Sequence, residues 1–323
     1  MKDLQSLISR LRERCPELEL RENEPMSRHT SFRVGGPVPL MALPKSEDEA
    51  RKLVTVAVRE FGEPPFFMGN GTNLLVADQG ADLLVVKTVG LDYLALTKRG
   101  EWPDRRTILA GSGVSLARLS NFALENGLTG LEFAHGIPGS VGGGVYMNAG
   151  AYGGELGQVI SSVAKLSFAA QTPSRPRGAP EFSYRYSIYQ EQPDTLILRA
   201  SFSLYPGDPA QIKAQMDDFD ARRREKQPLD LPSAGSTFKR PAPVGGGTTP
   251  NGQPVYAAAL IDQCGLKGLT VGGAKVSEKH AGFIVNKGGA TAADILALIE
   301  QVRQRVLDQT GVELEPEVRV IGI

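Results

Sequence analysis

The glycine-rich segment, residues 127–154, constrains the fold of this chain more than any other stretch. It places ten of the chain's 37 glycines within 28 positions. Such a density is unfavourable inside a helix or strand, where each glycine costs roughly 0.5–1 kcal/mol relative to alanine. It suits a backbone that passes close to another group, because successive glycine amides can form a concave nest for an anion. The segment therefore predicts a cradle for a nucleotide cofactor, with a purely structural crossover as the alternative.

Length and charge narrow the class of protein. The 323 residues predict two or three domains. Hydrophobic residues make up 41% and charged residues 22% of the chain, as is ordinary for a globular protein. Lys and Arg balance Asp and Glu at 36 each, so no net charge attracts nucleic acid or a membrane surface.

The chain carries little from which to build a disulfide framework or a metal site. Cys15 and Cys264 form no CxxC pattern, and two free thiols fit a reducing cytosol. Three scattered histidines offer few metal ligands. Charges interrupt the N-terminus before an apolar signal region can form, and no apolar run reaches the ~20 residues of a membrane span. We therefore expect a cytoplasmic monomer with no metal, no nucleic-acid partner and no membrane partner.

Local periodicity predicts an α+β fold. Helices are expected at 3–15, from a capping box of Ser46 and Glu49 to Gly62, from Ser115 to Gly127, and at 208–226, 255–264 and 291–309. Strands are expected at 83–86, 159–168, 195–205 (half-buried) and 312–321, with an extended segment at 29–37. The polar stretches 97–107, 171–180 and 241–254 are predicted loops.

Three glycine turns are candidates for binding phosphate: residues 69–73, 111–115 and 136–144. None completes a G-x-G-x-x-G fingerprint, since Leu74 and Leu116 occupy the third glycine position of the first two turns. A P-loop motif is also missing from the sequence. The pattern favours neither a dinucleotide Rossmann domain nor a P-loop NTPase, and spacing alone does not decide whether the turns converge on one diphosphate.

Seven motifs in this order carry a resemblance to a known family. They are Thr30-Ser31-Phe32-Arg33-Val34-Gly35-Gly36, Gly69-Asn70-Gly71-Thr72-Asn73-Leu74-Leu75, Gly136 to Gly143 with Asn148 to Tyr152, Tyr184-Arg185-Tyr186-Ser187, Gly235-Ser236-Thr237-Phe238-Lys239, Lys279 to Asn286, and Glu315 to Arg319. From about residue 27 to the C-terminus the chain resembles UDP-N-acetylenolpyruvoylglucosamine reductase, the flavoenzyme family that makes UDP-N-acetylmuramate for peptidoglycan.

The resemblance implies a fold of two domains. A two-lobed FAD-binding domain of the vanillyl-alcohol-oxidase (PCMH-type) kind is expected at 27–207, with lobes at about 27–90 and 91–207. Residues 1–26 form a helix and lead-in. A C-terminal α+β domain, 208–323, is expected to close over the UDP-sugar, its last strand returning toward the FAD domain.

The implied reaction uses non-covalent FAD and NADPH as the reductant. Hydride from the flavin N5 adds to C3 of UDP-N-acetylglucosamine enolpyruvate, and a proton adds to C2. The matching cofactor-binding positions are Arg33, Gly69, Asn70, Gly71, Thr72, Asn73, Leu74, Gly111, Gly136, Ile137, Pro138, Gly139, Ser140, Gly142, Gly143, Asn148, Ala149 and Gly150.

Three positions match the family's catalytic residues. Ser236 is implied as the proton donor, a role that requires a charge network to stabilise its alkoxide. Arg185 is implied to hold the substrate carboxylate, which its planar fork of donors suits. Glu317 is implied to polarise the intermediate or to assist protonation. The plain alternatives are a turn serine, a surface arginine and an edge carboxylate paired with Arg319.

Four further positions are implied to bind the substrate: Tyr184, Arg223, Lys226 and Lys239. The basic run 222–226 has a plain alternative, because positive side chains near the C-terminal end of a helix are favoured by the helix dipole.

Two features depart from the family pattern or mark a subgroup of it. Arg240-Pro241 replaces the family's common Asn-Pro, and the 242–254 insertion is longer than usual, so the loop beside Lys239 departs from the pattern. Only 51 positions separate Arg185 from Ser236. With no tyrosine between Tyr205 and Tyr256, the chain resembles the shorter form without a tyrosine lid.

Two other functions remain open at this point. One is a flavin-dependent oxidase of an alcohol or hydroxy acid, in which His135 is the candidate for covalent attachment. The other is a flavin- or nucleotide-sugar-binding module without catalysis.

Overall fold

The computed structural model describes residues 4–97, 104–168, 173–174, 178–241 and 255–322. The chain divides into two compact units. Unit 1 contains 1–24, 38–70 and 82–222, and unit 2 contains 25–37, 71–81 and 223–323. The units thus have different limits from the expected domains, because two short segments near the N-terminus belong with the C-terminal unit.

The first sheet of unit 1 is built near the N-terminus. Its strands lie in the order β1 (Glu19–Pro25), β2 (Pro37–Leu43), β5 (Leu84–Lys87) and β3 (Phe66–Met68), with β2, β5 and β3 parallel. The helices α1 (Leu4–Arg14) and α2 (Glu47–Phe61) contribute apolar side chains to the same core. Ser46 Oγ accepts from the Glu49 amide, and Glu49 accepts from the Lys45 amide, so the predicted N-terminal cap of α2 is confirmed.

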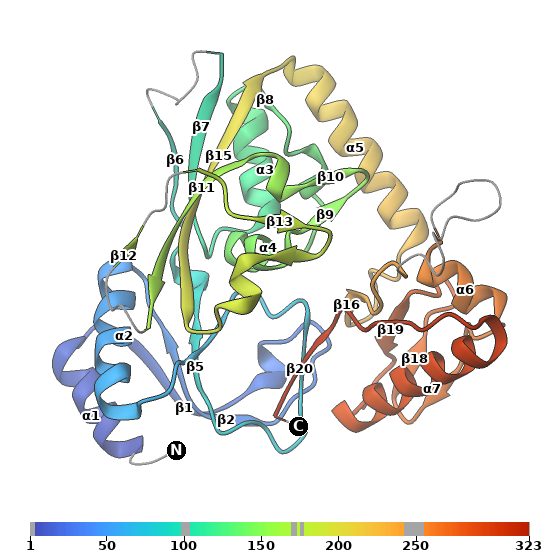
Figure 1. Ribbon diagram of the computed structural model, residues 1–323, viewed down its shortest axis with the longest axis horizontal. Helices are drawn as coiled ribbons and strands as arrows, with labels where there is room; N and C mark the ends of the chain where they lie inside the picture. The colour runs from blue at the N-terminus through green and yellow to red at the C-terminus, as the bar shows by residue number, and fades with distance from the viewer. Residues whose placement is uncertain (1–3, 98–103, 169–172, 175–177, 242–254, 323) are drawn as a thin grey trace. The chain divides into compact units, whose positions relative to one another are not determined.

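A second sheet of unit 1 has the order β12 (Pro173–Ser174), β11 (Ile160–Ser167), β15 (Thr195–Pro206), β7 (Arg106–Gly111) and β6 (Leu94–Leu96). Figure 1 shows β15 running between β11 and β7. The short β8 (Leu128–Thr129) pairs with the end of β15. The helices α3 (Leu116–Glu125) and α4 (Val141–Met147) pack into the core of this sheet.

Strand β15 is more buried than its alternating sequence predicts. Of the residues expected to face solvent, Thr195, Ile197, Ser201 and Ser203 are buried, Arg199 is half-buried, and only Tyr205 at the end of the strand is exposed. Because β15 is a central strand, its second face meets other protein groups. Ser162 Oγ donates to Ser201 Oγ across the β11–β15 pair at 3.1 Å. The expectation of a half-buried strand is therefore wrong.

Unit 2 contains a four-stranded antiparallel sheet. Its order is β16 (Ser233–Ser236), β19 (Phe283–Asn286), β18 (Ala274–Val276) and β17 (Thr270–Val271). The core includes side chains of α6 (Ala257–Gln263) and α7 (Ala292–Thr310). Thr291 and Asp294 form a capping box at the start of α7, and Gly311 ends it at φ 70°. The helix α5 (Pro209–Lys226) begins in unit 1 and ends in unit 2.

Two predicted extended segments differ in the structure. Residues 29–32 form turns and residues 33–36 are irregular, with Arg33 at φ 57° and Gly35 at φ 128°, so the segment is not extended as expected. The predicted strand 312–321 is reduced to β20 (Arg319–Ile321), which pairs in parallel with β4 (Leu74–Val76). Val320 is 42% exposed, so the alternation does not mark a single buried face.

The predicted loops fall partly outside the described residues. The 241–254 loop is described only at residue 241, and the 97–107 loop lacks 98–103. Within 171–180, Pro173 and Ser174 pair with β11, so this part is a strand edge and not a loop.

Candidate functional site

The second and third glycine turns meet in unit 1 through backbone hydrogen bonds. The Val141 amide donates to Val114 O and the Gly142 amide donates to Ser112 O, both at 2.8 Å. Gly69, in the unit 1 part of the first turn, also lies against the third turn, because a Cβ there would collide with Ser140 Oγ. The sequence left open whether the turns converge, and within unit 1 the second and third turns lie together with Gly69.

The glycine-rich segment contains a helix, contrary to expectation. Helix α4 begins after its N-cap Ser140 and includes three glycines in its seven residues. A Cβ at Gly142 would lie 2.9 Å from Ser112 Cβ, and one at Gly144 would lie 2.7 Å from Leu156 Cδ1. The missing side chains let the helix pack closely, which offsets the cost of glycine.

The amides at the start of α4 are bonded within the protein. Val141 and Gly142 donate to the neighbouring turn, and the Gly143 amide donates to Ser140 Oγ at 3.5 Å. These three amides therefore bond to acceptors within the protein and hold the start of α4 against the second turn. The hydroxyl of Ser112 is different: it is buried and has no hydrogen-bond partner among the described residues.

Asn148 connects the glycine-rich segment to the hairpin that carries Arg185. It is fully buried at φ 45°, a left-handed conformation that asparagine adopts more readily than most residues. Its Nδ2 donates to Ser183 O and its Oδ1 accepts from the Gly157 amide, both at 2.8 Å. The side-chain amide of this expected cofactor residue is thus engaged with the protein backbone.

Arg185 lies at the tip of a two-residue hairpin between β13 (Phe182–Ser183) and β14 (Tyr186–Ser187). Its φ of 54° is unusual for a residue other than glycine. Arg185 Nη2 donates to Gly150 O at 3.1 Å, and its Cζ lies 5.2 Å from the centre of the Tyr184 ring. Tyr184 and Arg185, both expected to contact substrate, are therefore adjacent to each other and to the glycine-rich segment.

Ser236 and Glu317 belong to one part of unit 2, which we call the serine–glutamate region (residues 233–239 and 315–319). Ser236 is exposed at the end of β16, after a register shift and Gly235 at φ 77°. Glu317 is half-buried and precedes β20, so it does not lie within the strand expected from the sequence. The Glu317 amide donates to Thr237 O at 2.8 Å, which places the two backbones side by side.

The first glycine turn also reaches this region. Asn73 Nδ2 donates to Glu317 O at 3.0 Å, and the Arg319 amide donates to Asn73 O at 3.1 Å. Gly71 O accepts from the Ser31 amide at 3.1 Å. In unit 2 the expected cofactor residues 71–74 are thus fixed to the segment that carries Glu317.

The expected basic substrate residues differ in their surroundings. Lys239 Nζ forms an ion pair with Glu315 Oε1 at 2.5 Å. Arg223 is 8% exposed and Lys226 is exposed, both in the last turns of α5. Lys279 Nζ donates to Arg224 O at 2.6 Å and so satisfies a carbonyl at the end of that helix. Arg33 is exposed.

His135 contacts helix α5 through its imidazole ring. Its Nε2 lies 3.2 Å from Asp220 Oδ2 on α5. Beside it, Tyr152 stacks on Phe219 with ring centres 4.5 Å apart. These contacts dock the unit 1 part of α5 on the glycine-rich segment, and they give His135 a structural role.

Sequence reasoning did not single out Thr237 or the connecting role of Asn73. Both lie inside quoted motifs, next to residues that were singled out. Their partners are distant in sequence, and no local pattern identifies such pairs.

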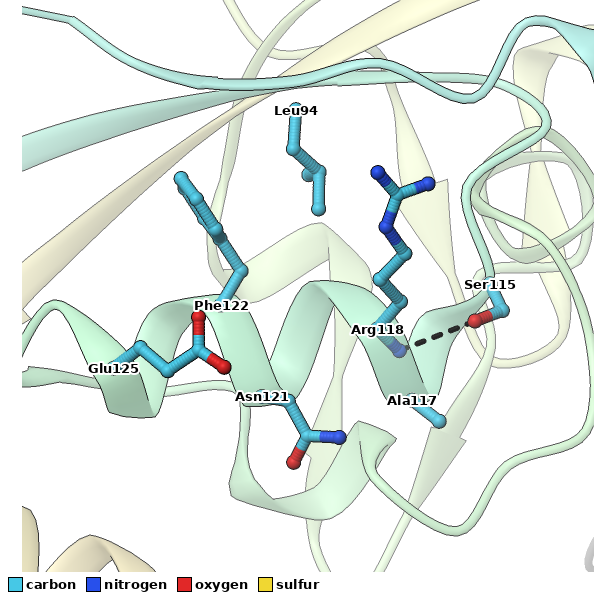
Figure 2. Close-up of a pocket in the computed structure, with 7 residues that line it drawn as sticks. All are labelled: Leu94, Ser115, Ala117, Arg118, Asn121, Phe122 and Glu125. Atoms are coloured by element: carbon cyan, nitrogen blue, oxygen red, sulfur yellow. Dashed lines mark hydrogen bonds between the residues drawn. The ribbon is translucent and has the colours of Figure 1, made fainter.

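A surface pocket of about 570 Å³ lies in unit 1 against α3. Figure 2 shows Arg118 and Phe122 extending from this helix toward Leu94, and a hydrogen bond from the Arg118 amide to Ser115 Oγ. Arg118 also pairs with Asp92 at 3.1 Å. The pocket is lined by none of the residues expected to bind cofactor or substrate.

The described residues contain neither a metal-binding cluster nor a membrane-spanning helix. No cluster of three or more His, Cys, Asp or Glu there is arranged to hold a metal ion. None of the helices in the same residues combines the length and apolar character needed to cross a membrane.

Comparison with protein families identifies both units. The model described as "FAD binding domain" matches residues 38–169. The model described as "UDP-N-acetylenolpyruvoylglucosamine reductase, C-terminal domain" matches residues 227–321. The expected α+β fold, an FAD-binding domain followed by a C-terminal domain of this family, is confirmed.

Individual relatives cover nearly the whole chain. UDP-N-acetylenolpyruvoylglucosamine reductase of Caldanaerobacter subterraneus subsp. tengcongensis is 46% identical over 98% of both chains. The enzyme of the same name from Geobacillus kaustophilus is 41% identical over 100% of this chain and 99% of its own. The crystal structure of the reductase from Thermus caldophilus has a TM-score of 0.73 at 30% identity, covering 94% of this chain and 99% of that one. The chain therefore belongs to the UDP-N-acetylenolpyruvoylglucosamine reductase family.

Proposed function

We propose that this protein is an FAD-containing oxidoreductase that reduces UDP-N-acetylglucosamine enolpyruvate to UDP-N-acetylmuramate with NADPH, in peptidoglycan precursor synthesis. The observation that carries the proposal is the 46% identity to a curated reductase over 98% of both chains. The free thiols of Cys15 and Cys264 support a cytoplasmic location.

The glycine turns of unit 1 fit a flavin nucleotide. Their backbones approach one another closely, and the unpartnered hydroxyl of Ser112 is a buried polar group that a ligand can satisfy. The residues proposed to hold FAD are the cofactor-binding positions named above, from Arg33 to Gly150. The chemistry that bound FAD would supply at these residues is the transfer of hydride from NADPH to C3 of the enolpyruvyl group.

Three side chains are proposed to complete the reaction. Ser236 donates the proton to C2, and its exposed hydroxyl at the end of β16 is accessible for that transfer. Arg185 binds the substrate carboxylate with its guanidinium fork. Glu317 stabilises the charge that develops as the proton moves.

Four residues are proposed to bind the rest of the substrate: Tyr184, Arg223, Lys226 and Lys239. For Lys239 to bind a phosphate of the substrate, its ammonium group must exchange its present partner, the Glu315 carboxylate. Glu315 is 69% exposed at its side chain, so a phosphate can displace it at little cost.

An anaerobic spectroscopic titration tests the function. The purified protein should show a flavin spectrum, lose it on addition of NADPH, and regain it when UDP-N-acetylglucosamine enolpyruvate is added. The flavin of Ser236→Ala should be reduced by NADPH at the normal rate but should not be reoxidised by the enolpyruvate. The control variant Ser233→Ala, on the same strand, should be reduced and reoxidised like the wild type.

Each outcome has a separate meaning. If NADPH reduces the flavin of the wild-type protein and the enolpyruvate does not reoxidise it, the protein acts on another acceptor. A protein that binds no flavin contradicts the proposed function altogether.

A further inference from the structure

We propose that Thr237 is a positioning residue that holds Ser236 and Glu317 in a fixed relation, a role that rests on the function proposed above. Thr237 follows the proposed proton donor directly, and its side chain is 0% exposed. Its hydrogen bonds reach two other segments of unit 2, residues 282–284 and Glu317.

Each polar group of Thr237 has a different partner. Its amide donates to Gly282 O at 2.8 Å, and its carbonyl accepts from the Glu317 amide at 2.8 Å. Its Oγ1 accepts from the Ile284 amide at 3.1 Å, within β19. One residue therefore ties the end of β16 to the neighbouring strand and to the segment that carries Glu317.

The hydroxyl is needed because the strand pairing is irregular at this point. The register between β16 and β19 shifts between Ser233 and Ser236, and Gly235 has a left-handed backbone with open space around its Cα. A bulge of this kind interrupts the regular ladder of backbone bonds. Thr237 Oγ1 supplies an acceptor for the Ile284 amide where the pairing resumes.

Glu317 is held from both sides. Its amide bonds to Thr237 and its carbonyl accepts from Asn73 Nδ2 at 3.0 Å. Pro316 lies opposite Phe238 in an antiparallel bridge, and the flanking bonds come from the Glu317 and Lys239 amides, so the missing proline N–H costs nothing. Loss of the Thr237 hydroxyl removes the side-chain bond to the Ile284 amide and leaves the Ser236 end of this arrangement to its backbone bonds alone.

Proton transfer depends on this geometry more strongly than flavin reduction does. A general acid acts only within hydrogen-bond reach of the atom it protonates, and a misplacement of about 1 Å can reduce a rate on the order of 100-fold. Reduction of the flavin by NADPH requires no proton from Ser236. A positioning role therefore predicts a loss confined to the second half-reaction.

The test compares Thr237→Val, which replaces the hydroxyl by a methyl group, with Thr237→Ser, which keeps it. For Thr237→Val we expect flavin reduction at the wild-type rate and reoxidation by the enolpyruvate slowed on the order of 10- to 100-fold. Thr237→Ser should recover most of the loss. Hydrogen exchange at the Ile284 and Glu317 amides should be faster in Thr237→Val, a readout that does not depend on the substrate.

Thr291→Ala is the matched stability control. It removes the N-cap of α7 in the same unit and should leave both half-reactions unchanged. If Thr237→Val fails to fold with flavin, Thr237→Cys replaces it, since a thiol is a poor acceptor of similar size.

Equal slowing of both half-reactions, an unaffected Thr237→Val, or a Thr237→Ser as impaired as the valine variant would overturn the proposal. Failure of the wild-type protein to reoxidise would count against the proposed function instead, and the exchange measurement would still test Thr237.

Discussion

The glycine-rich segment and the serine–glutamate region fix their backbones by opposite means. In the first, side chains are absent, so that turns and a helix approach within contact distance of each other. In the second, the side chains of Thr237 and Asn73 bond to distant backbone groups. Added atoms should therefore damage the first region, and removed atoms should damage the second.

Asn148 is the exception that tests this comparison, because it is a bonding side chain inside the glycine-rich segment. Asn148→Ala leaves Ser183 O and the Gly157 amide without their partner. Ser183 is exposed and Gly157 is half-buried, so water can partly replace the lost amide. The expected loss is therefore about 2–3 kcal/mol, near the low end of about 1–3 kcal/mol for each group, measured by urea denaturation.

Asn148→Asp is the matched variant for this loss. It keeps the acceptor for Gly157 and places a carboxylate oxygen opposite Ser183 O, where two acceptors repel, so it should be destabilised at least as much as alanine. If the aspartate variant is as stable as the wild type, the bond to Ser183 contributes nothing.

Two neighbouring glycines of α4 give the next largest contrast. Gly142→Ala forces a Cβ to within 2.9 Å of Ser112 Cβ, and overpacking of this kind costs about 1–3 kcal/mol. At Gly143 the nearest atom, Ser140 Oγ, would lie 3.7 Å away, so alanine should be neutral or stabilise by up to about 1 kcal/mol. Thermal unfolding of the two variants measures the difference, and equal effects would contradict the packing role of Gly142.

The smallest expected effect is a pH dependence in unit 2. Burial lowers the pKa of His280 from its usual 6.5, and the Gly282 amide donates to His280 Nδ1 at 3.1 Å, which requires that nitrogen to be unprotonated. Because the folded-state pKa is below the unfolded one, the unfolded chain binds the proton first as the pH falls. Stability should be unaffected above pH 6.5, decline below it, and stop declining below the folded-state pKa.

His280→Gln isolates this contribution. Urea denaturation between pH 5 and pH 8 should show a flatter profile for this variant than for the wild type. Parallel profiles would mean that groups other than His280 account for the dependence.

Local signals in the sequence predicted the helices well. Ser46, Thr291 and Asp208 each accept a backbone amide at a helix start, because a cap depends only on residues two or three positions away. The glycine helix α4 was missed, and β15 was predicted as a strand without the burial of its second face, since both features depend on what packs against them. The positions of the site residues came from the resemblance, whereas the bonds of Thr237 span 45 to 80 residues of chain and have no local signature.

The backbone of Arg185 has a consequence for attempts to stabilise the protein. A left-handed conformation costs an arginine about 1–2 kcal/mol that a glycine would not incur. Arg185→Gly would relieve this cost, but it would also remove the hydrogen bond to Gly150 O and the proposed carboxylate contact. The strain at this position is therefore retained for what the side chain contacts, and selection for heat resistance alone would not preserve the proposed carboxylate contact.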